Sequence, residues 1–150
     1  MRAFTLIELI AVMVVLAVLA ATAVPRYIDY RTRARSAAMQ GLLGNVRTAI
    51  ANFYANSSLT GTPAYPTLVQ LTTEGTVVEG RFPANPYNSL NSVTTADSGS
   101  WTARTVAGTA GWRYYVDNTA NPPVCGFYAN SGDNTTVTDP AGGVFQANEL

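Results

Sequence analysis

The chain has 150 residues, nine Arg, nine Asp or Glu and a formal net charge of zero. Neutrality argues against nucleic acid as the main partner, and a single cysteine without any histidine excludes an intramolecular disulfide and a Cys/His metal site. Beside one membrane-length helix, the length leaves room for a single small domain of roughly 100 residues.

An apolar segment of membrane length lies at the start of the sequence. From Phe4 to Val24 there is no Gly, no Pro and a single charge, that of Glu8. As a helix these residues span about 30 Å, the thickness of the hydrocarbon core of a bilayer. The segment therefore predicts a transmembrane helix over residues 4–24.

Glu8 is out of place in such a segment. A carboxylate within an apolar membrane helix is costly, so it is normally there to meet a partner, a proton or an ion. The alternative is that Glu8 lies close enough to the helix end to stay solvated among the headgroups.

The surrounding residues match a known signal. Phe4-Thr5-Leu6-Ile7-Glu8-Leu9, the apolar helix and then Pro25 together resemble the class III prepilin signal of type IV pilins and type II secretion pseudopilins. The resemblance implies cleavage by a prepilin peptidase between Ala3 and Phe4, which makes residues 1–3 a leader. It also implies N-methylation of Phe4 and a role for Glu8 in subunit assembly.

The physical logic of assembly follows from the charge of Glu8. Inside a bundle of apolar helices an ionised Glu8 needs a cation, and no basic residue lies between Phe4 and Val24. The α-amino group of Phe4 on a neighbouring subunit, free only after cleavage, supplies one. Repeated without closing, this contact builds a helical homopolymer. The expected partners are thus further copies of the chain, the inner membrane before assembly, and the peptidase with its assembly machinery.

The end of the apolar segment also has features of a secretory signal. Ala21-Thr22-Ala23 is similar to the A-x-A site at which secretory signal peptides are cut. Those peptides have a shorter apolar core and no use for Glu8, so we favour the membrane helix.

Arginines dominate the residues that follow. The positive-inside rule would place the C-terminal body in the cytoplasm, whereas the prepilin resemblance places it outside, and we follow the more specific motif. The side chains are expected either to snorkel to headgroups or to pair with acidic groups on neighbours in a filament. The four arginines are Arg26, Arg31, Arg33 and Arg35, and only Asp29 offsets their charge.

Pro25 is expected to kink the helix, because it lacks an N–H and clashes with the carbonyl four residues earlier. Helical character resumes at once and predicts an amphipathic continuation over residues 25–56, ended by Gly61 and Pro63. Gly41 and Gly44 either permit close approach of another backbone or mark a flexible point. The apolar stripe expected to be buried is Leu42, Val46, Ala49, Ile50 and Phe53.

Residues 57–150 are rich in Thr, Asn, Gly, Ser and Pro, and predict a β-rich globular head. Packed on the helix, these strands give an α+β fold with a small antiparallel sheet, the pilin fold that the resemblance implies. Residues 66–71 are expected to be a short helical or extended connection, and residues 81–104 a long loop. The predicted strands are Thr76–Val78, Trp112–Val116, Val124–Tyr128 and Val144–Phe145.

Nothing in the head indicates catalysis. The lone Cys125 has no histidine to activate it, and no serine lies in a nucleophile-elbow pattern. An enzyme is therefore not expected, and no cofactor is required. Asp133, Asn134 and Asp139 offer oxygens of the kind that Ca²⁺ prefers and form a calcium candidate, although such residues are usually turn formers.

The sequence thus predicts a structural subunit of a type IV pilus-like filament, a bacterial inner-membrane precursor that ends on the cell surface. The alternative within the family is a major pseudopilin of a type II secretion system, a periplasmic piston. Two other classes of protein would have a different mature form. A monomeric membrane-anchored binding protein keeps its N-terminus and forms no polymer. A secreted enzyme loses the apolar segment.

Overall fold

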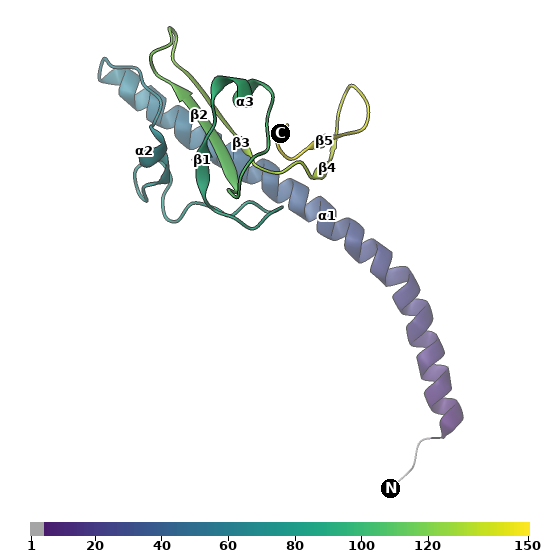
Figure 1. Cartoon of the computed structure of the whole chain (residues 1–150). Coiled ribbons are helices and arrows are strands. Elements are labelled where there is room, and N and C mark those ends of the chain that lie inside the picture. Colours follow the sequence, from purple (N-terminus) through teal and green to yellow (C-terminus); the bar gives the residue numbers. More distant parts are fainter. Residues whose placement is uncertain (1–4) are drawn as a thin grey trace. The chain divides into compact units, whose positions relative to one another are not determined.

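A computed structural model describes residues Thr5–Leu150. They belong to two compact units, Met1–Ala34 and Arg35–Leu150. One helix, α1 (Leu6–Leu59), contributes to both (Figure 1). The predicted long N-terminal helix is therefore confirmed, with bounds close to those expected.

The C-terminal end of α1 is closed by backbone hydrogen bonds. Gly61 adopts φ 86° and donates its N–H to the carbonyl of Ser58 at 3.2 Å, while the N–H of Thr62 reaches the carbonyl of Ser57 at 3.4 Å. This pair of bonds is a Schellman motif, which requires a left-handed residue that glycine adopts without strain. Gly61 thus ends the helix, as predicted.

Pro25 lies inside α1, and the helix continues through it. Its missing N–H leaves the carbonyl of Ala21 without the usual donor four residues on. The expected kink stays a prediction.

In the second unit a three-stranded sheet in the order β1-β2-β3 lies across α1 (Figure 1). The strand β2 pairs antiparallel with β3, with Trp112 opposite Ala129, and parallel with β1, with Val93 opposite Trp112. A separate antiparallel pair, β4 and β5, follows. The α+β class is confirmed, but the main sheet is mixed where an antiparallel one was expected. The strands are β1 (Val93–Thr95), β2 (Trp112–Asp117), β3 (Val124–Ala129), β4 (Asn134–Thr138) and β5 (Val144–Gln146).

Two short helices complete the second unit. The first, α2 (Leu68–Thr72), is opened by a capping box between Thr67 and Gln70. The second, α3 (Ser98–Thr102), is capped by the Asp97 carboxylate, which accepts the N–H of Ser100 at 2.7 Å. It lies within residues 81–104, where only a loop was expected. Thr76–Val78 forms a turn, although the sequence predicted a strand at these residues.

The core lies between α1 and the sheet. Strand alternation directs Trp112 and Tyr114 toward α1, where they pack with Phe127. Val46 and Ile50 of the expected stripe are buried, but Leu43 is buried in place of Leu42, and Ala49 and Phe53 are only half-buried. The buried stripe on α1 is Met39, Leu43, Val46 and Ile50.

Asn85 organises the loop that closes the core. Its buried amide donates to the carbonyl of Gly111 at 2.7 Å and accepts the N–H of Tyr87 at 2.8 Å. The hydroxyl of Tyr87 in turn lies 3.0 Å from that of Ser36 on α1. The loop is thereby fixed to both the sheet and the helix.

Candidate functional site

The start of α1 is closed by a capping box. The N–H and the hydroxyl of Thr5 each donate to Oε2 of Glu8 at 2.9 Å, and the N–H of Glu8 donates to the Thr5 hydroxyl at 3.3 Å. These bonds satisfy donors that the first turn of a helix otherwise leaves free. The Thr-x-x-Glu spacing is a helix-start signal visible in the sequence, and it identifies Thr5 as a site residue that we had not singled out.

Beyond the capping box, the helix surface is apolar and uncovered. Every residue from Leu6 to Val24 is exposed. Among the residues that the structure describes, α1 is the one helix long and apolar enough to cross a membrane. Glu8 is the single charge on this surface, and its carboxylate is turned back onto its own helix end.

Of the predicted site residues, Ala3 and Phe4 lie outside the described residues. Glu8 is placed in the first turn of α1 and Pro25 nineteen residues from its start, at the end of the apolar surface. The processing and methylation roles of Ala3 and Phe4 and the assembly role of Phe4 and Glu8 stay predictions, as does the kink at Pro25.

The three calcium candidates are not gathered into one site. Asp133 precedes β4, Asn134 opens it and Asp139 follows it, so an extended strand separates the two aspartates by roughly 15–20 Å. One Ca²⁺ holds its ligands within about 2.5 Å. Each carboxylate instead closes a local turn, Asp133 with the hydroxyl of Ser131 at 2.5 Å and Asp139 with the N–H of Ala141 at 2.8 Å.

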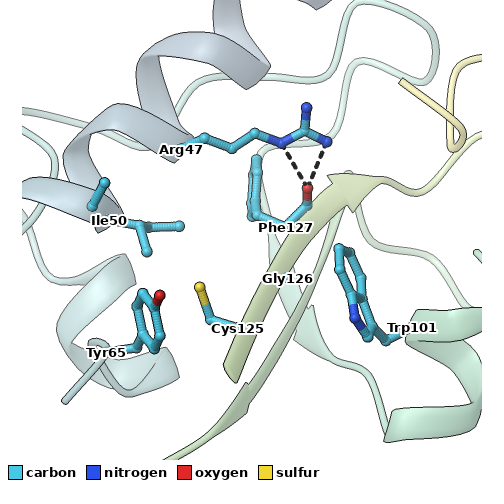
Figure 2. Close-up of a pocket in the computed structure, with 8 residues that line it drawn as sticks. Arg47, Ile50, Tyr65, Trp101, Cys125, Gly126 and Phe127 are labelled. Carbon is cyan, nitrogen blue, oxygen red and sulfur yellow. Dashed lines mark hydrogen bonds between the residues drawn. The ribbon is translucent and has the colours of Figure 1, made fainter. Parts of the chain in front are cut away.

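A cavity of about 210 Å³ lies in the second unit between α1 and the outer edge of β3 (Figure 2). At one end the guanidinium of Arg47 donates two hydrogen bonds to the carbonyl of Phe127, at 3.2 and 3.0 Å. At the other end lie Tyr65 and the thiol of Cys125. Trp101 packs on the opposite side of the strand, against Gly126.

The thiol and the guanidinium of this cavity are not activated for catalysis. Burial raises the pKa of the Cys125 thiol to about 11, so it stays protonated at neutral pH and is a poor nucleophile. Burial, and next the charge of Arg104, lower the pKa of Arg47, whose guanidinium is already bonded to backbone carbonyls. No group of three His, Cys, Asp or Glu side chains gathers anywhere in Thr5–Leu150.

Comparison with known proteins bears on the N-terminal helix. Residues 1–24 match the family described as the prokaryotic N-terminal methylation motif. This motif is the class III prepilin signal of type IV pilins and pseudopilins, so the resemblance is confirmed. No solved structure matches the chain. Together with the apolar helix, the signal indicates a membrane-anchored precursor that is a prepilin peptidase substrate.

Proposed function

We propose that the chain is a structural subunit of a type IV pilus-like filament on the cell surface. The precursor is held in the inner membrane by residues 4–24, cut between Ala3 and Phe4, methylated on Phe4 and polymerised through α1. It performs assembly rather than chemistry.

One observation carries the proposal most directly: an apolar helix surface, exposed from Leu6 to Val24, that carries a single carboxylate one turn from its start. Lipid covers this surface in the precursor, and the same helices of other subunits cover it in a filament. Burying roughly 1,000 Å² of it per subunit is worth about 25 kcal/mol as an upper estimate. A polymer built this way dissociates very slowly in water.

The capping box gives Glu8 a second role that has to be separated from assembly. Within one subunit its carboxylate satisfies the N–H of Thr5, a task that glutamine performs as well. Between subunits it would neutralise the α-amino group of Phe4, a task that requires the negative charge. Glu8→Gln and Glu8→Ala therefore distinguish the two roles.

The test is the yield of filaments sheared from cells that express each variant. Glu8→Gln and Glu8→Ala should both abolish filaments while the precursor accumulates in the membrane, because the charge is lost in both. Glu74→Ala, which removes an exposed carboxylate of the head, is the matched control and should assemble normally. Normal filaments from Glu8→Gln would assign Glu8 to helix capping alone and remove the inter-subunit ion pair.

A major pseudopilin of a type II secretion system is the second candidate. The C-terminal part of the head favours it, because β4 and β5 are held by hydrogen bonds and the thiol of Cys125 is free, so no disulfide closes this region within Thr5–Leu150. The two functions differ in the phenotype of a deletion. Loss of surface filaments with normal protein secretion supports the pilus, and loss of secretion without loss of surface filaments supports the pseudopilus.

A further inference from the structure

Three arginines and two tyrosines, all exposed, follow the apolar part of α1 within its first unit. They are Arg26, Tyr27, Tyr30, Arg31 and Arg33, here termed the collar. The rings of Tyr27 and Tyr30 are 69% and 68% exposed, so a neighbouring surface can cover them. The collar begins two residues after Val24, where the apolar surface ends.

The positive charges of the collar exceed the negative charge beside them. Asp29 lies three residues after Arg26 and four before Arg33, at spacings that permit ion pairs on a helix. Yet none of the three arginines forms an ion pair with a carboxylate of Thr5–Leu150. The helix segment therefore presents a net charge of two positive units to its surroundings.

The collar side chains lie on one half of the helix circumference. Arg26 and Arg33 are seven residues apart and share a side, whereas Arg31 is rotated from Arg26 by roughly 140°. Tyr27 and Tyr30 fill the directions between them. All five directions fall within roughly 160° of the circumference, so the collar is one basic and aromatic face of α1. The positive charge of this face is complementary to lipid phosphates.

The depth of the collar also fits a headgroup layer. The helix is unbroken from Leu6 through Ala34, so Arg26 and Arg33 lie about 3 and 13 Å beyond Val24 along its axis. Side chains on a helix lean toward its N-terminus, which here is the direction of the apolar segment. The arginines therefore point back to the phosphates, and the tyrosines to the level at which aromatic rings gather at membrane interfaces.

We propose that the collar is a binding site for anionic phospholipid headgroups in the leaflet where α1 leaves the membrane. The inference rests on the membrane-held precursor of the proposed function. Each guanidinium binds a lipid phosphate by charge-assisted hydrogen bonds, and the two tyrosines fix the height of the helix. The collar holds the precursor at one depth before assembly, in contacts that have to be released when the helix leaves the bilayer.

The test uses the full chain reconstituted in phosphatidylcholine vesicles with spin-labelled phosphatidylglycerol or spin-labelled phosphatidylcholine as the probe. Electron spin resonance then gives the relative affinity of the motionally restricted lipid. Wild type should prefer the anionic probe by roughly two- to fivefold at low ionic strength, and high salt should remove most of this preference. The variant Arg26→Gln/Arg31→Gln/Arg33→Gln should bind both probes about equally.

Matched single variants control for charge alone. Arg31→Gln should lower the preference, whereas Arg81→Gln, which removes an exposed arginine of the head, should leave it unchanged. Arg2 and Asp29 remain in every variant, so differences between variants report on the collar. An unchanged preference in the triple variant, or equal binding of both probes by wild type, would overturn the proposal.

Two outcomes separate this inference from the proposed function. If alkaline carbonate strips the wild-type chain from the vesicles, the membrane helix itself is wrong. If the chain is retained without lipid preference and the triple variant fails to form filaments in cells, the arginines pair with acidic side chains of neighbouring subunits, and the lipid site is rejected.

Discussion

The two units of the chain differ in where their apolar side chains lie. In Arg35–Leu150 the large side chains of Trp112, Tyr114 and Tyr128 are at most 1% exposed. In the described part of the first unit, Thr5–Ala34, every residue is exposed. The second unit therefore supplies its own solvent-excluded core, whereas the first depends on lipid or other subunits to cover it. If the proposed function is right, the residues that fold the head and the residues that assemble the filament lie in separate parts of the sequence.

Removing the first unit should have the largest effect. The chain Arg35–Leu150 retains Met39, Leu43, Val46 and Ile50, the whole helical side of the core. We expect it to be folded, monomeric and completely lost from membranes, as measured by circular dichroism, gel filtration and vesicle flotation. Aggregation or a disordered spectrum would show that the second unit depends on the first.

Gly111→Ala should destabilise the second unit strongly. A Cβ at this position would lie 1.9 Å from the carbonyl oxygen of Leu90, a backbone atom that cannot move alone. We expect the free energy of unfolding in urea to fall by about 3 kcal/mol. Gly132→Ala is the control, because its Cβ would meet only Oε1 of Gln146 at 3.7 Å. Similar losses from both variants would contradict the close approach.

Alkaline pH should weaken the second unit through Cys125. Burial raises the pKa of this thiol from 9.0 to about 11, so in that interval the unfolded chain has lost a proton that the folded chain keeps. Stability is therefore fully present below 9.0 and falls as the pH rises toward about 11. The melting temperature should fall over this interval, and Cys125→Ser should make the fall shallower. An equal pH dependence in both proteins would show that the Cys125 thiol does not cause the fall in melting temperature.

Gly44→Ala should have the smallest effect on folding and decides the role of the helix glycines. No atom lies within 4 Å of a Cβ built at Gly41 or Gly44, so alanine fits and should stabilise the second unit by about 1 kcal/mol. If another helix packs closely there, the same substitution lowers filament yield. Normal filaments from a stabilised variant would favour the flexible-point interpretation.

The elements that local pattern determines could be predicted. The long helix follows from the apolar run over residues 4–24 and from the helical spacing of apolar residues after Pro25. The strands β2, β3 and β5 follow from β-branched and aromatic residues. Val46 and Ile50 of the buried stripe were predicted correctly. Leu43 is buried in place of Leu42, because both leucines fit the spacing and only packing against the sheet selects Leu43.

The elements that distant contacts determine could not be predicted. Strand β1 has three residues and exists through its parallel pairing with β2, so Val93–Thr95 carries little signal of its own. Thr76–Val78 has β-forming residues, but Gly75 and Gly80 adopt positive φ and the N–H of Gly75 bonds to the carbonyl of Val78 at 3.0 Å, which makes a turn. In the site, the prepilin motif identified Glu8. Its hydrogen-bond partner Thr5 could have been identified from the Thr-x-x-Glu spacing of a capping box.

The measurement that tests the central claim most directly is peptide mass spectrometry of the N-terminus in filaments sheared from the cell surface. The account predicts a mature chain that begins at Phe4 with one added methyl group. A chain that still begins at Met1 would remove the free amine that Glu8 is proposed to meet, and a chain that begins near Val24 would make the apolar segment a cleaved secretory signal. Either result would contradict assembly through α1.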